Sequence, residues 1–142
     1  MALRPESLRA RLLRLEEIIS RLERLAAAPG AGPPDAWAVE RGLQLAAEVT
    51  FDIGNHILAA HFGVNAQDYE DILERLAEHE VLPGELRSRL RGLGGFRNLL
   101  VHGYLRLDPD VVAAKLSQAP KDFSDFAAAV RQWMQGLGSA SN

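Results

Sequence analysis

The sequence has no cysteine among its 142 residues, which excludes disulfide bonds, thiolate zinc sites and a cysteine nucleophile. It also has no uninterrupted apolar run of about 18 residues, so we expect no membrane-spanning helix and no membrane association. The first residues lack the apolar core of a secretory signal, and we therefore expect a cytoplasmic protein. The formal net charge of -3 argues against a broad nucleic-acid-binding surface, so any such surface must be local or shared between subunits.

Acidic residues are absent from residues 86–107, although this span holds five arginines. In a chain of negative net charge, this local reversal of sign predicts a binding site for an anion such as a phosphate. The same run also has a purely structural explanation, because the helix dipole favours basic side chains near a helix C-terminus. The sequence leaves both explanations open. The five residues are Arg87, Arg89, Arg91, Arg97 and Arg106.

Arg97, His102 and Tyr104 lie close together inside this basic span. An imidazole has an ordinary pKa of about 6.5, so it accepts or donates a proton near neutral pH, and a guanidinium offers forked donors to phosphate oxygens. Cleavage of RNA without a metal needs a base for the ribose 2′-hydroxyl, an acid for the 5′-oxygen and positive charge at the phosphorane. One histidine cannot be base and acid at once, so we predict a homodimer that brings two copies of the motif into one groove.

On a regular helix, Arg97 and His102 would be separated by about 140° around the axis and about 7.5 Å along it. We therefore expect the motif to straddle a helix end, with Gly103 as the stop. Asn98 lies four residues before His102, on the same helical face, where it can orient the imidazole or hold the substrate. Tyr104 can stack on a base or hydrogen-bond a phosphate.

Apolar residues recur every three or four positions along most of the chain, and no segment alternates strictly between apolar and polar residues. This pattern predicts an all-α fold. We expect a first helix over about residues 8–25, a loop rich in proline and glycine over residues 29–34, and a second helix over residues 36–61 capped by Asp35. The second helix holds two glycines that permit close approach of a neighbouring helix, Gly42 and Gly54.

A third helix is expected from about Asp68, and a fourth is expected to begin at Pro83 and to carry the arginines. Gly103 ends this fourth helix. A fifth helix is expected over residues 109–118, and Pro120 is expected to open a sixth. The result is an up-and-down helical bundle of five to six helices.

The chain length fits one domain with one core. We expect this domain to span residues 1–138. Residues 139–142 offer nothing apolar to bury, and we expect them to form a disordered tail.

Three further histidines invite a metal-site interpretation, namely His56, His61 and His79. His56 and His61 are five residues apart, which is poor spacing for a shared metal, and neither has a cysteine or a His-Glu-x-x-His frame, so we predict no metal site. We also expect no cofactor. His56 is instead expected to pair with Asp52, one helical turn earlier. Trp37 and Trp133 are expected to anchor the core or an interface.

With the tyrosine included, the pattern Arg97-x4-His102-x-Tyr104 resembles the signature of HepT-like toxins, a branch of the HEPN superfamily of small helical ribonucleases. Residues 40–56 resemble the long second helix of that family, and residues 95–102 resemble its run into the catalytic site. Two separated matches in the right order are more specific than the short motif. Together they cover most of the chain from Ala36 to Tyr104.

The resemblance implies a HEPN-like domain that acts as the toxin of a type VII-like toxin–antitoxin system. By this resemblance the protein is a metal-independent endoribonuclease, with Arg97 and His102 as the catalytic pair in a composite cleft between the protomers of a homodimer. The implied partner is a minimal nucleotidyltransferase antitoxin of the MntA type, which transfers AMP to Tyr104. The added nucleotide would bring negative charge and bulk into a cleft built for phosphate and so exclude RNA. The residues expected to support RNA binding are Asn98, Arg91 and Arg106.

Two other functions stay open from the sequence. The first is a non-catalytic helical module that binds a partner nucleotidyltransferase and presents a nucleotide to it, which the same arginine cluster would serve. The second is a helical oligomerisation protein, favoured if Arg97 and His102 lie far from any cleft. An RNA cleavage assay that compares the wild type with His102→Ala separates these functions from a ribonuclease.

Overall fold

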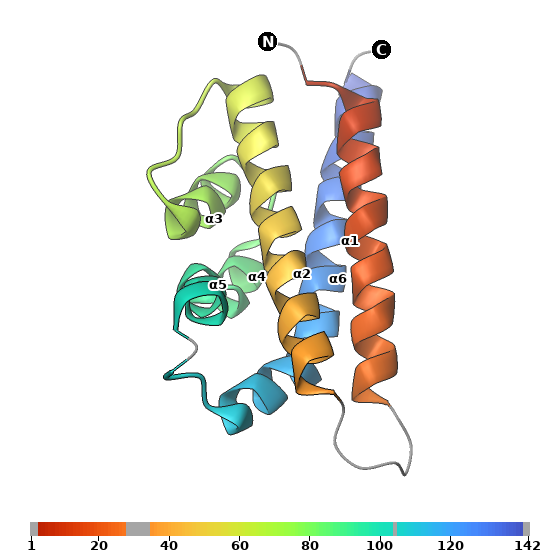
Figure 1. Cartoon of the computed structure of the whole chain (residues 1–142). Helices are drawn as coiled ribbons and strands as arrows, with labels where there is room; N and C mark the ends of the chain where they lie inside the picture. The colour runs from red at the N-terminus through yellow and green to blue at the C-terminus, as the bar shows by residue number, and fades with distance from the viewer. Residues whose placement is uncertain (1–2, 28–34, 104, 141–142) are drawn as a thin grey trace.

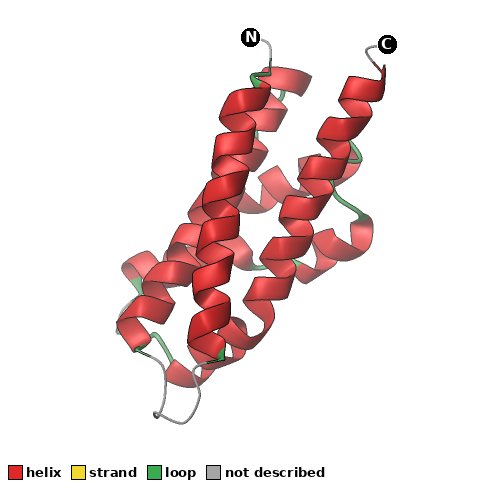
Figure 2. Ribbon diagram, turned by 90° about the vertical axis from the view of Figure 1, so that its right-hand side faces the viewer, coloured by secondary structure: helices red, strands yellow, loops and turns green. Residues whose placement is uncertain are grey.

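The computed structural model describes residues 3–27, 35–103 and 105–140. Every regular element in these residues is a helix, and the described segments contain no β-strand (Figure 2). This confirms the all-α fold expected from the apolar spacing. Three long helices lie side by side, and three short helices cover one side of them (Figure 1). The long helices are α1 (Pro5–Ala26), α2 (Ala36–Ile57) and α6 (Pro109–Ala140).

Helix α1 buries the apolar stripe that its spacing predicts, with Leu8, Leu12 and Leu15 fully enclosed. It packs against both α2 and α6, so α1 closes the bundle on one side. Helix α2 contacts α1, α6 and two of the short helices, and it is therefore the central element of the fold. Asp35 caps α2 as expected, because its side chain accepts a 3.0 Å hydrogen bond from the backbone N–H of Trp37.

Helix α2 continues without a break into a π-helical segment, η1 (Leu58–Phe62), which ends at Gly63 in a left-handed conformation. Helix α3 (Tyr69–Glu78) begins after its cap, Asp68. The two glycines singled out in α2 do allow close packing. A Cβ atom at Gly42 would lie 2.8 Å from Leu22 of α1, and one at Gly54 would lie 2.6 Å from Ile72 of α3.

The expected fourth helix is two helices, α4 (Gly84–Arg89) and α5 (Leu93–His102). The interruption falls at Gly92, whose φ of 88° is in the left-handed region that favours glycine. Leu90 and Leu93 are both buried on either side of the turn, so the break lets both short helices pack against the core. Pro83 stands just before α4 rather than inside its first turn.

The expected fifth and sixth helices are one continuous helix, α6, with Pro120 in its interior. Proline has no backbone N–H to donate a hydrogen bond to the carbonyl four residues earlier, and the loss of this bond bends a helix. Figure 1 shows that α6 bends near its lower end. The apolar stripe nevertheless continues in phase across the proline, through Leu116, Ala119 and Phe123, all buried. Packing of this stripe against α1 and α2 therefore keeps the helix continuous.

Helix α6 extends through Ala140, two residues into the segment expected to be a tail; residues 141 and 142 lie outside the described part of the chain, as does the loop expected over residues 29–34. Among the described helices, none combines the length and apolar composition needed to span a bilayer.

Candidate active site where α2, α3 and α5 meet

The N-terminus of α5 is fixed by a side chain of α3. The carboxylate of Glu70 accepts 3.1 Å hydrogen bonds from the backbone N–H groups of Gly92 and Gly94. These N–H groups have no partner inside the helix, and a carboxylate also interacts favourably with the positive end of the helix dipole. Glu70 thus caps α5 from outside and sets the position of the helix that carries the basic motif.

Gly94 brings α5 into close contact with α3. A Cβ atom at this glycine would lie 2.6 Å from the Cβ atom of Tyr69, closer than packed side chains allow. The ring of Tyr69 in turn stacks on Phe51 of α2, with ring centroids 4.4 Å apart. Tyr69 therefore forms a fixed aromatic surface between α2 and the first turn of α5.

Arg97 lies over this surface and reaches α2. Its Cζ atom is 5.4 Å from the centroid of the Tyr69 ring, within the range of a cation–π interaction. Its Nη2 atom donates a 3.0 Å hydrogen bond to Glu48, and Nη1 donates one of 3.2 Å to the side-chain oxygen of Asn98. The side chain is 20% exposed, so the guanidinium is held on three sides and still reachable from solvent.

Glu48 is held in its charged form by these neighbours. A hydrogen bond of 3.1 Å from Gln44, followed by the hydrogen bond and charge of Arg97, lowers the pKa of Glu48 below its ordinary value. The carboxylate is therefore ionised at neutral pH and remains a fixed partner for the guanidinium. Two helices thus fix the direction of Arg97.

His102 is the last residue of α5, and Gly103 follows as the C-cap, so the predicted helix stop is correct. Arg97 and His102 both lie within α5, before that stop, so the helix end does not bring these two side chains together as expected. Regular helical spacing then places them about 140° apart around the axis, with Arg97 against α2. His102 and Asn98 are both exposed, as expected for residues on one face. Tyr104 lies outside the described residues.

The basic span does not form one cationic pocket. The buried guanidinium of Arg87 pairs with Glu70 at 3.4 Å and Glu74 at 3.2 Å. Arg89 pairs with carboxylates of α4 and α6, Glu85, Asp122 and Asp125. The sequence missed these pairings because the acidic partners come from outside the span.

Arg91 and Arg106 are different, because both are exposed and neither pairs with a carboxylate of the described residues. Arg91 lies in the turn between α4 and α5, and Arg106 lies in the turn that precedes α6. They remain available to an anionic ligand. The basic span is thus divided between two structural arginines, two available ones and Arg97.

Sequence reasoning gave no role to Glu48 or Tyr69, the two residues that hold Arg97. Their spacing along the chain carries no signal for this contact, because it depends on how α2, α3 and α5 pack. The expected pair of His56 with Asp52 is also wrong, since Asp52 accepts a 2.7 Å hydrogen bond from Arg11 instead. Trp37 is not a core residue, because it is 84% exposed.

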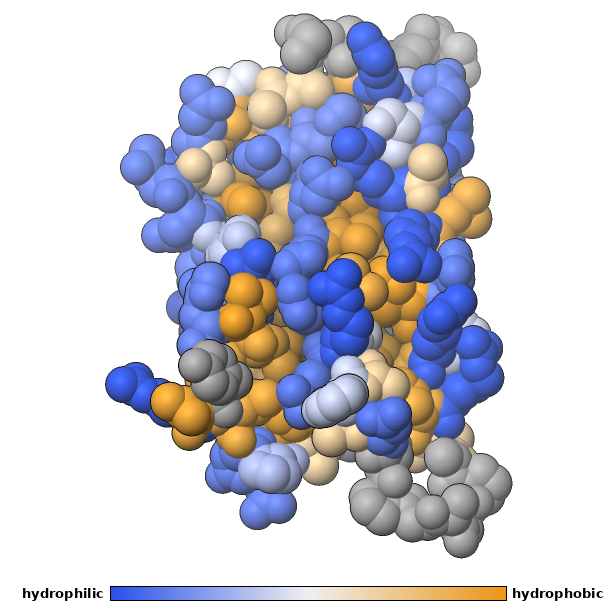
Figure 3. Space-filling view, in the orientation of Figure 1, coloured by the Kyte–Doolittle hydropathy of each residue, from blue (hydrophilic) through white to orange (hydrophobic). Residues whose placement is uncertain are grey.

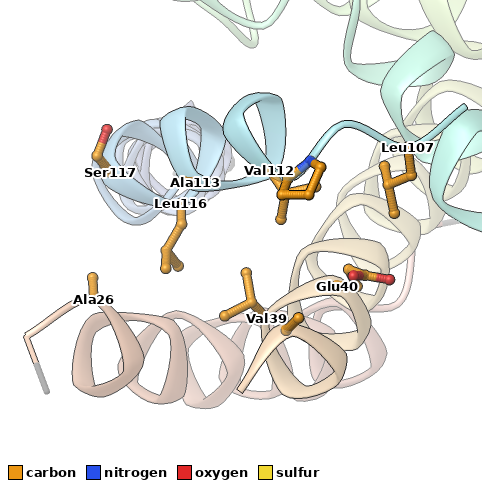
Figure 4. A pocket seen from close by; sticks show the side chains of 10 residues that line it. Ala26, Val39, Glu40, Leu107, Val112, Ala113, Leu116 and Ser117 are labelled. Atoms are coloured by element: carbon orange, nitrogen blue, oxygen red, sulfur yellow. The ribbon is translucent and has the colours of Figure 1, made fainter. Parts of the chain in front are cut away.

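Two hollows flank this part of the molecule. A shallow one of about 230 Å³ adjoins the Arg97 contacts and is lined by Glu48, Tyr69 and polar residues of α2. An apolar pocket of about 350 Å³ lies at the end of the bundle between α1, α2 and α6, and among the described residues that line it only Glu40 is charged (Figure 4). Of the two, the shallow hollow is thus the one whose lining includes Glu48 and Tyr69, the residues that hold Arg97. The described residues hold no group of three His, Cys, Asp or Glu side chains placed to bind a metal ion.

Comparison with known proteins places these residues in a family. The family described as ribonuclease HepT-like matches residues 11–130. A tRNA nuclease HepT of Aphanizomenon flos-aquae is 30% identical over 96 residues, which is 67% of this chain and 65% of that protein. An mRNA nuclease HepT of Shewanella oneidensis is 31% identical over 84 residues, 59% of this chain and 63% of that protein. The chain thus spans less than two thirds of the length of each of these relatives.

Solved structures share the fold. A cytosolic protein of unknown function from Bacillus subtilis, YutE, superposes with a TM-score of 0.79 at 21% identity, over 96% of this chain and 95% of that one. A tri-AMPylated HEPN toxin of Shewanella oneidensis, in complex with its MNT antitoxin, gives a TM-score of 0.77 at 23% identity, over 88% and 96%. At these identities the likeness shows the architecture alone.

Proposed function

Because the chain belongs to the ribonuclease HepT-like family, we propose that it is a ribonuclease toxin that cleaves RNA with Arg97 and His102. One observation carries this proposal. Arg97 is fixed to α2 by Glu48 and stays partly exposed, while His102 is exposed at the end of the same helix. A guanidinium held in this way is ready to bind a phosphate, and an exposed imidazole can exchange protons with a substrate.

The reaction we propose needs no metal. An imidazole removes the proton of the ribose 2′-hydroxyl, the 2′-oxygen bonds to phosphorus, and the 5′-oxygen leaves with a proton from a second acid. Arg97 stabilises the additional negative charge on the phosphorane, and Asn98 holds the substrate or orients His102. The products are a 2′,3′-cyclic phosphate and a 5′-hydroxyl. Arg91 and Arg106 bind flanking phosphates.

The site we propose is composite and lies between two copies of the chain. A single α5 places Arg97 and His102 on different faces, about 140° apart, so one protomer does not present both to one phosphate. In a symmetric dimer, the imidazole of one chain can serve as base while that of the other serves as acid. We propose this homodimer as the active form, acting in the cytoplasm.

Regulation by a nucleotidyltransferase is the second part of the proposal. A related toxin has been solved in AMPylated form with its MNT antitoxin, and we propose that a similar MntA-type partner transfers AMP to Tyr104. The added phosphate would repel RNA from the neighbouring arginines. Intact-mass analysis after incubation with the partner and ATP should show added AMP on the wild type and none on Tyr104→Phe.

A cleavage assay with purified protein in the presence of a metal chelator tests the nuclease. The wild type should cleave RNA and leave 2′,3′-cyclic phosphate ends, whereas Arg97→Ala and His102→Ala should not. Both variants should retain the wild-type unfolding temperature within a few degrees, because each replaced side chain is at least partly exposed. Cleavage that requires added metal, or that persists in His102→Ala, contradicts the mechanism.

One observation favours a second candidate, a non-catalytic module that presents a nucleotide to a partner transferase. Within a single chain, Arg97 is already occupied by Glu48. If the pair also persists in the dimer, the arginine would hold an anion only through its remaining N–H groups. The second candidate predicts AMP transfer to the chain without any RNA cleavage, so the two assays above distinguish the candidates.

A further inference from the structure

A second basic surface lies on the outside of the bundle, between α1 and α2. A groove of about 440 Å³ runs there, and we call it the arginine groove. Its floor is apolar, with Ile18, Leu22 and Leu45 among its residues. Its sides carry four arginines and no lysine, namely Arg14, Arg21, Arg24 and Arg41. Figure 3 shows this face, where hydrophobic residues visible between α1 and α2 are flanked by strongly hydrophilic ones.

The positive charge of the groove is only partly balanced. Glu17 lies 3.0 Å from Arg14 and 3.6 Å from Arg21, so one carboxylate serves two guanidinium groups. Arg24 donates a hydrogen bond of 3.1 Å to the hydroxyl of Ser20, which carries no charge. Arg41 takes part in none of the ion pairs among the described residues. The groove therefore holds excess positive charge in a chain whose formal charge is -3.

The groove and the Arg97 site both involve α2, where Arg41 lines the groove and Glu48 binds Arg97. Arg41 and Glu48 are seven residues apart on this helix, which places them on nearly the same face and about 10.5 Å apart along its axis. The charge of Arg41 also contributes to the lowered pKa of Glu48, behind the Gln44 hydrogen bond and Arg97. A chain bound at Arg97 can therefore follow α2 toward its N-terminus and reach Arg41.

Trp37 stands one turn beyond Arg41 on α2 and is 84% exposed. A large aromatic side chain left in solvent usually marks a contact surface, and its ring offers a stacking platform for a nucleobase. Single-stranded nucleic acids are bound by such a combination, a basic groove with an aromatic ring beside it. An acidic protein segment would match the charges, but it would give no reason for the groove to lie on the same face of α2 as the partner of Arg97.

We propose that the arginine groove binds single-stranded RNA extending from the phosphate held at Arg97, with Trp37 stacking on one of its bases. The groove arginines contact backbone phosphates and the apolar floor accommodates base faces, so the groove adds affinity without strong sequence preference. This inference rests on the proposed ribonuclease function, because it takes RNA as the ligand. In this proposal, α1 and α2 recognise the part of the RNA that lies away from the cleaved bond.

The test measures binding separately from cleavage. All proteins carry His102→Ala, so that a fluorescein-labelled, unstructured single-stranded RNA stays intact during an anisotropy titration at several salt concentrations. The groove variant carries Arg24→Ala and Arg41→Ala. The matched control carries Arg4→Ala and Arg9→Ala, which remove the same charge from exposed positions at the opposite end of α1.

We expect the groove variant to bind RNA about tenfold more weakly. The salt dependence of binding, measured as the slope of log Kd against log salt concentration, should fall by about 1.4. Each phosphate contact to a single strand contributes about 0.7 to this slope, and the variant loses two such contacts. The control should stay within about threefold of its parent, because only non-specific attraction is reduced. Trp37→Leu, which keeps an apolar side chain but removes the ring, should weaken binding about fivefold or more.

Equal RNA affinity for the groove variant and the control overturns the proposal. So does a groove variant that binds RNA normally but no longer assembles with an antitoxin, because the groove is then a protein-docking surface. These outcomes are distinct from failure of the nuclease proposal. If the wild type binds RNA through the groove but does not cleave it, the mechanism fails and the groove assignment stands.

Discussion

Glu48 on α2 accepts a 3.0 Å hydrogen bond from Arg97 on α5, across 49 residues of sequence. This contact joins the central helix of the bundle to the helix that carries the basic motif. The pair is accessible at its edge, since Glu48 is 34% and Arg97 20% exposed. Its main effect is therefore on the direction of the guanidinium, because partly exposed ion pairs add little to stability.

Replacing Glu48 by alanine should reduce RNA cleavage about 10- to 100-fold, because an arginine displaced by about 1 Å loses that much catalytic efficiency. Glu48→Gln keeps an acceptor for the hydrogen bond and should retain more activity than Glu48→Ala. The free energy of unfolding should change by less than about 1 kcal/mol in both. Cleavage rates at saturating RNA, together with denaturant unfolding, provide the measurement.

Asp52→Ala is the matched control for this experiment. Asp52 lies on the same helix and beside the same shallow hollow, but it pairs with Arg11 of α1. Its loss should leave kcat unchanged. Equal effects of Asp52→Ala and Glu48→Ala would mean that the general negative charge of α2 matters, and not the contact with Arg97.

Arg87 and Arg91 provide a test of how the basic span is divided. Arg87 is buried between two carboxylates of α3, so Arg87→Met should lower the free energy of unfolding by about 1–3 kcal/mol. Arg91 is exposed, so Arg91→Met should change it by less than about 0.5 kcal/mol. RNA affinity should fall in Arg91→Met and change less in Arg87→Met. If Arg87→Met loses RNA affinity but no stability, Arg87 binds RNA and is not a structural arginine.

The cap on α5 can be isolated by comparing Glu70 with Glu74. Both carboxylates lie on α3 and contact Arg87, but only Glu70 also accepts hydrogen bonds from the first turn of α5. Glu70→Ala should therefore cost about 1–2 kcal/mol more than Glu74→Ala. Amide exchange in the first turns of α5 should accelerate in Glu70→Ala and stay unchanged in Glu74→Ala. Equal exchange rates in the two variants would show that α5 does not depend on this cap.

The sequence predicts the bundle well because its signals are local. The apolar spacing of α1, the cap at Asp35 and the close packing at Gly42 and Gly54 all depend on residues within one helix or on the size of one side chain. Pro120 shows the limit of such signals. A proline predicts a helix start, but buried residues on both sides of it hold α6 together.

The residues of the candidate site could be predicted from the sequence, but the residues that hold Arg97 in place could not. Arg97 and His102 stand out because of the basic span and the family resemblance. The partner of Arg97 did not, because Glu48 meets it only once α2 and α5 have packed together. The same dependence on packing explains why Arg87 and Arg89, which look equivalent to Arg91 in sequence, pair with carboxylates of other helices.

His56 makes the stability of the protein dependent on pH. Its Nε2 atom is buried without a hydrogen-bond partner in the described part of the chain, and burial, followed by the charge of Arg11, lowers the pKa of His56 below 6.5. Asp52 opposes this shift and Arg4 adds to it. Below the ordinary imidazole pKa, the unfolded chain therefore binds more protons at this position than the folded chain does.

The contribution of His56 is thus present above about pH 6.5 and is lost as the pH falls through the lowered pKa of the folded state. Unfolding by denaturant at a series of pH values should show the wild type losing stability over this range, and His56→Leu should show a flatter profile. His61→Leu, which removes an exposed imidazole, is the matched control. If His56→Leu and the wild type lose stability in parallel, other groups, such as the carboxylates, control the acid sensitivity and the buried imidazole does not.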